Sequence, residues 1–149
     1  MTQEEFIEIL AGEGYSYEIE GDKIIVTNEG TVYLTALTSI PPGVEFKNGG
    51  NAWLGSLTSL PPDVEFKNEG DVDLSALTSL PPGVEFNNGG EVYLTALTSI
   101  PPDVVFKNGG SVDLSYLIGR WFKEWKGNIK GIASKRLLNV MIKQGIFER

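Results

Sequence analysis

The sequence contains no cysteine and no histidine among its 149 residues. Without cysteine there is no disulfide framework, no thiolate zinc site and no cysteine nucleophile, which fits a reducing compartment. Without histidine, Ser-His-Asp triads and imidazole acid–base chemistry are excluded, and zinc and copper sites lose their commonest ligand. These absences remove most familiar classes of enzyme, so we expect a non-enzymatic protein with no metal and no cofactor.

Long apolar runs are also missing. None approaches the roughly 18 residues of a membrane-spanning helix. The first five residues, Met1-Thr2-Gln3-Glu4-Glu5, are polar and acidic, unlike the basic and then apolar start of a secretory signal. We therefore expect a soluble, cytoplasmic protein that does not interact with membranes.

Basic residues are scarce over most of the chain. Residues 1–118 carry 18 acidic residues against four lysines, a net charge of −14. Residues 119–149 carry eight basic residues against two acidic ones, a net charge of +6. Charge segregation of this kind affects partners and association rather than fold. One hypothesis is therefore self-assembly, in which the basic C-terminal part of one copy docks on the acidic body of another.

What the chain does contain is a 20-residue repeat. The same position of each repeat is occupied by a three-residue segment whose first and third residues are apolar: Val32-Tyr33-Leu34, Ala52-Trp53-Leu54, Val72-Asp73-Leu74, Val92-Tyr93-Leu94 and Val112-Asp113-Leu114. Apolar residues two apart have the spacing of a strand, and they recur as Val44 and Phe46 in the same coil. A unit of this length buries its apolar face only by stacking on its neighbours.

These patterns predict a mainly β, single-domain parallel β-solenoid of 20-residue coils with small helical caps at both ends. We place the N-terminal helix and hairpin cap at residues 1–23, the solenoid at 24–118, and a basic helical cap at 119–149. Six positions per coil are expected to point inward, in the first full coil Val32, Leu34, Leu37, Ile40, Val44 and Phe46.

Two kinds of corner separate the strands. Pairs of prolines fix backbone dihedrals and remove N–H donors, as at Pro41-Pro42 and Pro61-Pro62. The other corner reads Asn-Gly-Gly in three coils, and we expect its glycines to supply positive φ. Asparagine recurs at the start of this corner, where a stacked ladder of amides would satisfy backbone groups and bond to the next coil: Asn28, Asn48, Asn68, Asn88 and Asn108.

The ends carry capping signals. Thr2 and Glu5 form a capping box for a short helix, and the segments 15–20 and 23–27 form a hairpin. At the other end we expect aromatic residues after Leu117 to cover the last coil, and a second helix to run from its N-cap to a terminating glycine. The aromatic residues are Trp121, Phe122 and Trp125. The second helix has Ser134 as its N-cap, carries Leu137, Leu138, Met141 and Ile142, and ends at Gly145, after which Ile146 and Phe147 are expected to fold back on the protein.

The phrase Leu57-Thr58-Ser59-Leu60-Pro61-Pro62-Asp63-Val64 and its copies resemble the L-x-x-L-P-x-x-L core of short bacterial leucine-rich repeats. The resemblance covers residues 24–118, but the chain lacks a helix in each repeat and places Val-x-Phe before the asparagine. A β-solenoid is therefore expected rather than a horseshoe. The chain is also similar to repeat proteins carried by bacteriophages and prophages, which implies an accessory protein that inhibits a host enzyme or defence complex.

The outward position of the first strand in each coil is a candidate binding face. It forms a column of aromatic and acidic residues, Tyr33, Trp53, Asp73, Tyr93 and Asp113, flanked by Asn51, Asp71 and Glu91. Tyrosine and tryptophan supply large rigid contact areas and are enriched at interface hot spots. Aromatic residues also stabilise sheets through cross-strand contacts, so a structural role stays open.

The second strand of each coil places Glu45, Glu65, Glu85 and Val105 outward near lysines, which indicates a solvated charge ladder. Other hypotheses have less support. Acidic columns could mimic nucleic-acid phosphates, and Gly70-Asp71-Val72-Asp73 resembles the turns of calcium-binding β-rolls, but the nonapeptide period is missing. The bases and aromatics of residues 120–126 fit a cap helix better than a nucleic-acid site.

The leading prediction is a non-enzymatic protein–protein interaction module that binds its partner through the strand face. The alternatives are the self-assembling structural protein and a carboxylate-based hydrolase that would use Asp71, Asp73, Glu91 or Asp113. The hydrolase has the least support, because carboxylates on one short ladder are easily solvated and nothing in the sequence implies a deep cleft.

Overall fold

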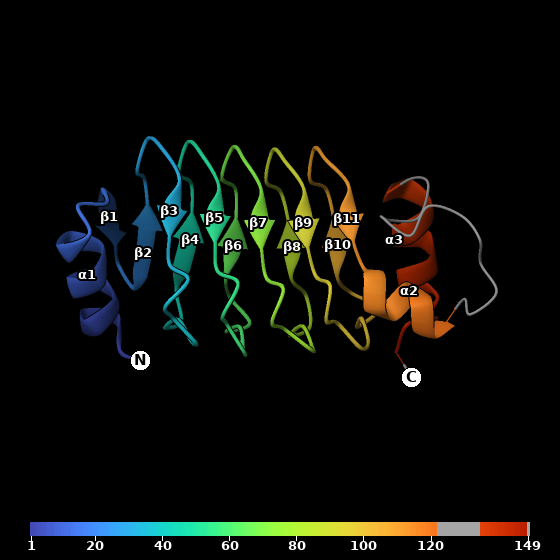
Figure 1. Cartoon of the computed structure of the whole chain (residues 1–149). Coiled ribbons are helices and arrows are strands. Elements are labelled where there is room, and N and C mark those ends of the chain that lie inside the picture. The colour runs from blue at the N-terminus through green and yellow to red at the C-terminus, as the bar shows by residue number, and fades with distance from the viewer. Residues whose placement is uncertain (122–134, 149) are drawn as a thin grey trace.

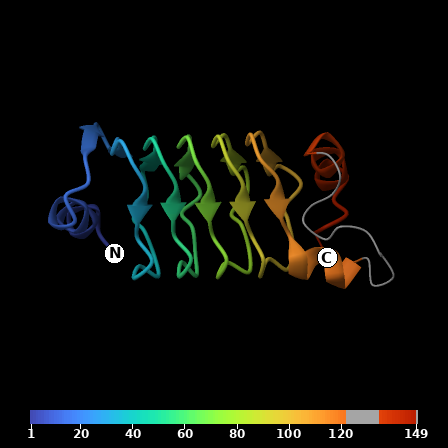
Figure 2. The ribbon, with the colours of Figure 1, turned by 45° about the horizontal axis from the view of Figure 1, so that its top comes forward.

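In a computed structural model, which describes residues 1–121 and 135–148, the chain forms a parallel β-solenoid. Figure 1 and Figure 2 show the coils stacked in one row, with helix α1 at one end and helix α3 at the other. The predicted fold class is therefore confirmed: the protein is mainly β, with parallel coils of about 20 residues and short helices at the ends.

Each coil contributes one strand to each of two sheets. The six-stranded sheet has the order β1-β2-β4-β6-β8-β10, and the five-stranded sheet has the order β11-β9-β7-β5-β3. The first contains β1 (Tyr17–Glu20), β2 (Lys23–Val26), β4 (Val44–Phe46), β6 (Glu65–Phe66), β8 (Glu85–Phe86) and β10 (Val105–Phe106). The second contains β3 (Val32–Tyr33), β5 (Ala52–Trp53), β7 (Val72–Asp73), β9 (Val92–Tyr93) and β11 (Val112–Asp113).

The register places repeat-equivalent residues beside each other. Val32 pairs with Ala52 and Phe46 pairs with Phe66, in both cases parallel and 20 positions apart. Four buried phenylalanines therefore stack along the axis, with ring centroids 5.5, 5.3 and 5.0 Å apart from Phe46 to Phe106. The inward positions form one continuous core, although Leu37 and Leu60 are only partly buried.

The asparagine corner is held by side chain to backbone hydrogen bonds. The Asn68 Nδ2 donates to the Gly50 carbonyl at 3.1 Å in the preceding coil and to the Asp71 carbonyl at 3.0 Å in its own coil. Asn48, Asn88 and Asn108 repeat this pattern. Asn28 differs, because its Oδ1 accepts from the Ser16 N–H at 3.5 Å in the N-terminal cap. The amides thus bond to backbone rather than to one another.

The expected reason for the glycines at this corner is wrong. Positive φ occurs instead in the proline corner, at Gly43 (81°) and Gly83 (79°), and not at Gly49 or Gly50. A Cβ atom at Gly49 would lie 2.2 Å from the Glu29 carbonyl oxygen, and one at Gly89 would lie 2.2 Å from that of Glu69. Glycine is favoured at these two positions because the backbones of stacked coils approach closely there, although the equivalent position of the coil between them holds Glu69.

The N-terminal cap closes one end of the core. In α1 (Gln3–Gly12) the Thr2 hydroxyl accepts from the Glu5 N–H, and Phe6 and Leu10 are buried. Strand β1 pairs antiparallel with β2, which in turn pairs parallel with β4, so the hairpin leads directly into the first coil. The Gln3 side chain joins helix to solenoid by donating to the Asp22 carbonyl at 2.7 Å and the Pro42 carbonyl at 2.9 Å.

The C-terminal cap comprises α2 (Ser115–Trp121) and α3 (Lys135–Lys143). Leu138, Ile142 and Phe147 are buried, and the Phe147 carbonyl accepts from the Ile100 N–H at 2.7 Å. Leu137 lies in α3 as expected and is 50% exposed. Phe122, Trp125 and Ser134 lie outside the described residues, as does the side chain of Trp121.

One capping device was not foreseen. The side-chain amide of Asn139 in α3 accepts from the Phe106 N–H at 2.9 Å and donates to the Phe106 carbonyl at 2.8 Å. Strand β10 is the last strand of the six-stranded sheet, and these two bonds pair the backbone of Phe106 on its outer edge. Unpaired strand edges promote association with other chains, so this contact protects the solenoid end.

Candidate functional site

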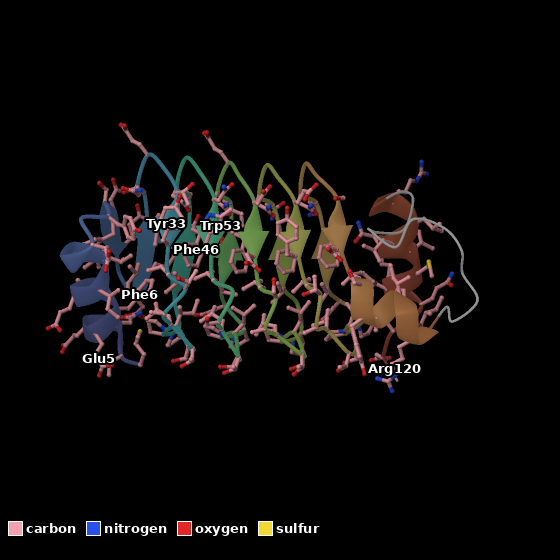
Figure 3. All side chains as sticks on the ribbon, in the orientation of Figure 1. Glu5, Phe6, Tyr33, Phe46, Trp53 and Arg120 are labelled. Carbon is pink, nitrogen blue, oxygen red and sulfur yellow. The ribbon has the colours of Figure 1, made fainter. Side chains whose placement is uncertain are left out.

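The predicted column lies on the outer surface of the five-stranded sheet. We call this surface the aromatic–acid face and define it by Tyr33, Trp53, Asp73, Tyr93 and Asp113, which are register neighbours along β3, β5, β7, β9 and β11. Tyr33 is 63% exposed, and the other four side chains are partly exposed. Figure 3 shows Tyr33 and Trp53 close together toward the N-terminal end, far from Arg120 at the other end.

The first strand of this face has a protected edge. The Tyr33 N–H donates to the Tyr15 hydroxyl at 3.0 Å, which gives β3 a partner where no further strand follows. In the sequence, Tyr15 is the first residue of the predicted hairpin segment 15–20. Nothing in the repeat indicates that its hydroxyl caps a distant strand. The aromatic end of the face is therefore fixed to the N-terminal cap.

The flanking residues Asn51 and Asp71 have a structural role. The Thr31 hydroxyl accepts from the Asn51 N–H at 3.1 Å, the Asn51 Oδ1 accepts from the Asp71 N–H at 2.8 Å, and the Asp71 Oδ1 accepts from the Glu91 N–H at 2.8 Å. Each side chain thus satisfies the backbone of the next coil. This ladder fixes the spacing of the strands that carry the face.

Glu91 departs from that pattern, because its carboxylate accepts hydrogen bonds from two side chains. Its Oε2 accepts from the Tyr93 hydroxyl at 2.5 Å, and its Oε1 accepts from the Ser111 hydroxyl at 3.2 Å. The hydrogen bond to Glu91 raises the pKa of Tyr93 from 10.0 to about 12, with further contributions from burial and from the negative charges of Glu91, Asp71 and Asp113. The Tyr93 ring is therefore held in place and surrounded by carboxylates.

Asp73 and Asp113 each use one carboxylate oxygen in a local turn. The Asp73 Oδ1 accepts from the Ser75 N–H at 3.0 Å and from the Ser75 hydroxyl, and Asp113 makes the equivalent bonds to Ser115. Within the described chain, no hydrogen bond is made by the second oxygen of either carboxylate. These carboxylates are oriented by their turns, and their other oxygen has no hydrogen-bond partner in the described chain.

The acids on and beside this face have no counter-charge among the described residues. Asp71, Asp73, Glu91 and Asp113 form no ion pair with any lysine or arginine in residues 1–121 and 135–148. The four lysines of the solenoid lie on the other sheet, beside its outward glutamates. The face is therefore both aromatic and electrostatically negative.

The outer surface of the six-stranded sheet differs. We call it the glutamate–lysine face and define it by Glu45, Glu65, Glu85 and their lysine partners Lys23, Lys47, Lys67 and Lys107. Glu45 is only 3% exposed, so the predicted solvated ladder is wrong at this position. The three lysines around its carboxylate lie 3.5, 3.5 and 3.2 Å away (Lys23, Lys47 and Lys67), and they cover it.

Glu65 shares two of these lysines, with Lys23 Nζ at 2.7 Å and Lys67 Nζ at 2.8 Å. Hydrogen bonds from Lys23 and Lys67 lower the pKa of Glu65, and hydrogen bonds to Glu65 raise the pKa of both lysines. Glu85 pairs with Lys107 at 2.8 Å. Charge on this face is therefore largely neutralised within the protein.

A hollow of about 360 Å³ lies on the glutamate–lysine side, lined by Pro62, Asp63, Val64, Glu65, Lys67, Gly83, Glu85 and Asn87. Its acidic side chains already take part in the contacts of the solenoid: Asp63 accepts from the Gly43 N–H, and Glu65 and Glu85 pair with lysines. Among the described residues, no group of three potential metal-binding side chains comes together. The aromatic–acid face is the stronger candidate site.

No helix in the described part of the chain is both long and apolar enough to cross a membrane. Comparisons with protein-family models, with curated proteins and with solved structures find no match to this chain.

Proposed function

We propose that this protein is a non-enzymatic interaction module that binds another protein through the aromatic–acid face. Solenoid repeat folds commonly act as interaction scaffolds, because stacked repeats present extended, regular surfaces. The observation that carries the proposal is the column of aromatic residues with the core packed behind it: Tyr33 and Trp53 lie on neighbouring parallel strands, and Tyr93 lies two strands further along the same sheet. Aromatic side chains of this kind contribute a large share of binding energy at protein interfaces.

Rigidity supports the same proposal. Backbone bonds from Asn51 and Asp71 to the next coil fix the strands, and Glu91 fixes the Tyr93 hydroxyl. A face that is ordered before binding loses little conformational freedom when a partner docks, so more of its contact energy is available as affinity. The structural bonds of these flanking residues are compatible with binding, because they leave the outward column itself available.

The resemblance to repeat proteins of bacteriophages and prophages favours a more specific version, in which the partner is a host enzyme or defence complex and binding inhibits it. This version rests on analogy of the repeat phrase, and the aromatic–acid face supplies the surface it requires.

Self-association is a second candidate, favoured by charge segregation. Residues 1–118 carry a net charge of −14 and residues 119–149 a net charge of +6, so the C-terminal end of one copy is complementary to the body of another. In sedimentation at 20 mM and 500 mM salt, this function requires dimers or chains that dissociate as salt screens the charges. Monomers at both salt concentrations contradict it.

The proposed function is tested by comparing the two faces in partner capture. The tagged protein, a Tyr33→Ser/Trp53→Ser/Tyr93→Ser variant and a Glu65→Ser/Glu85→Ser/Lys107→Ser variant are incubated with bacterial lysate, after circular dichroism has shown that all three are folded. We expect the aromatic substitutions alone to abolish capture of a stoichiometric protein. Loss through the opposite face, or capture unchanged by both variants, contradicts the proposal.

A further inference from the structure

The two faces point to the chemistry of the partner. Four carboxylates on or beside the aromatic–acid face have no ion-pair partner in the described chain, whereas the glutamates of the other face are paired with lysines. Unpaired acids arranged around aromatic rings are complementary to arginine and lysine. Arginine binds a carboxylate through two parallel hydrogen bonds and stacks on aromatic rings, and both basic side chains gain from cation–π contact.

Spacing makes the expectation more specific. Asp73 and Asp113 lie on either side of Tyr93, each one strand away in the register. With adjacent strands about 4.8 Å apart, the two carboxylates are separated by about 9.6 Å along the solenoid axis. A polyproline II segment repeats its side-chain direction every three residues and rises about 9.3 Å over them. Two basic residues separated by two others in such a segment therefore match the two aspartates.

Tyr93 suits the centre of this arrangement. Its hydroxyl is bound to Glu91 at 2.5 Å, so the ring is fixed, and it stays partly exposed. The negative charges of Glu91, Asp71 and Asp113 contribute to raising the pKa of Tyr93, which places them within electrostatic reach of its hydroxyl. The ring thus offers an apolar surface inside a negative field, where the stem of an arginine or lysine can pack.

We propose that the partner presents an extended basic segment, with two arginine or lysine side chains at positions i and i+3 that bind Asp73 and Asp113 on either side of the Tyr93 ring. This inference rests on the proposed function and deepens it, because it names the chemistry that the same face recognises. The occupant is a segment of another protein, and a second copy of this chain is the alternative that the experiment separates.

The test uses labelled peptides of defined spacing. One probe is Pro-Pro-Arg-Pro-Pro-Arg-Pro-Pro, and its matched control, Pro-Pro-Arg-Arg-Pro-Pro-Pro-Pro, has the same composition and charge with adjacent arginines. A third peptide carries glutamate in place of both arginines. Fluorescence anisotropy gives the Kd of each peptide, up to millimolar protein, for the wild type, for Asp73→Asn/Asp113→Asn, for Tyr93→Leu and for Glu85→Gln on the opposite face.

We expect the spaced arginine peptide to bind at least about fivefold more tightly than the adjacent-arginine peptide, and the glutamate peptide not to bind. The aspartate double variant should weaken binding of the spaced peptide about tenfold, Tyr93→Leu about threefold, and Glu85→Gln not at all. Asparagine keeps the Oδ1 that caps Ser75 and Ser115, so the double variant is expected to fold.

Absent binding of the spaced peptide, equal binding of both arginine peptides, or an affinity unchanged in the aspartate variant overturns the inference. If wild-type protein self-associates and Asp73→Asn/Asp113→Asn makes it monomeric, the occupant is a second copy, which also overturns it. The proposed function is judged separately, by partner capture with the aromatic variant. If capture depends on Tyr33, Trp53 and Tyr93 but the protein binds no basic peptide, only the basic-segment inference is overturned.

Discussion

The outer surfaces of the two sheets are built from the same repeat, yet their acidic side chains differ in whether they form ion pairs with lysines. On the glutamate–lysine face, Glu65 lies within 2.8 Å of Lys23 and Lys67, and Glu45 is buried beneath lysines. On the aromatic–acid face, Asp73 and Asp113 have no basic partner in the described residues and lie beside exposed or partly exposed aromatic rings. One face pairs its charges internally, and the acids of the other have no ion-pair partner in the described residues.

Under the proposed function, this difference assigns stability to one face of the solenoid and binding to the other. Ion pairs within the glutamate–lysine face join coils that are one or two repeats apart, as when Lys23 reaches Glu65. The aromatic–acid face obtains its order from backbone bonds instead, so its side chains are free to differ between coils. Asp73 and Tyr93, for example, occupy the same repeat position with different chemistry.

The largest effect should come from breaking the corner that both faces share. A Cβ atom at Gly90 would lie 2.8 Å from the Gly70 carbonyl carbon, and the equivalent residue is glycine in every coil, so Gly90→Ala forces stacked coils apart. We expect the free energy of unfolding to fall by about 3 kcal/mol or more in urea denaturation. Gly12→Ala is the control, because a Cβ there meets no atom within 4 Å. Equal stability of the two variants would contradict the close-approach explanation.

The next effect separates the faces. Glu45→Gln removes a buried charge that three lysines surround, and we expect a loss of about 2 kcal/mol, between the values for exposed and fully buried ion pairs. Asp73→Asn keeps the turn-capping oxygen and should change stability by less than about 0.5 kcal/mol. Chemical denaturation of both variants measures the contrast. A larger loss for the aspartate would reverse the assignment of the structural and binding faces.

How far the sequence predicts these features varies with the range of the contacts. The period fixed the strand positions, the parallel register and the inward phenylalanines, because these depend on repeat-equivalent residues. Glu45, Glu65 and Glu85 look equivalent in the sequence, but their burial falls in that order, and so does the number of lysines paired with each carboxylate in the described chain, from three to two to one. Lys23, one of these lysines, lies in the N-terminal hairpin outside the repeat. The bonds of Tyr15 to β3 and of Asn139 to β10 join segments outside the repeat, so no periodicity indicates them.

A third prediction concerns the ordered ring on the aromatic–acid face. With the pKa of Tyr93 raised to about 12, absorbance at 295 nm should show one of the five tyrosines ionising well above the ordinary value of 10.0. Because the raised pKa favours the protonated phenol in the folded protein, its contribution to stability is complete below pH 10 and is lost as the pH rises through 12. Tyr93→Phe should remove this step, with circular dichroism confirming the fold; a step that persists assigns it to another tyrosine.

The smallest effect is the acid response of the glutamate–lysine face. Lys23 and Lys67 lower the pKa of Glu65, so its stabilising contribution is present above its ordinary pKa of 4.5 and is lost as the pH falls below that value through the lowered pKa. Since the side chain is 34% exposed, we expect only about 0.5 kcal/mol. Urea unfolding between pH 3 and pH 6 should show a shallower decline for Glu65→Gln than for Glu29→Gln, an exposed glutamate outside the ion pairs. Identical slopes would argue against this coupling.

Site-specific photo-crosslinking from the two faces measures which of them contacts a partner. A benzophenone amino acid replaces Tyr33, which is 63% exposed, or Glu85, whose side chain is 47% exposed, so both probes are accessible on opposite faces. Irradiation in lysate should give one discrete protein adduct from position 33 and none from position 85. The same adduct from both positions, or an adduct from position 85 alone, would contradict the assignment of binding to the aromatic–acid face.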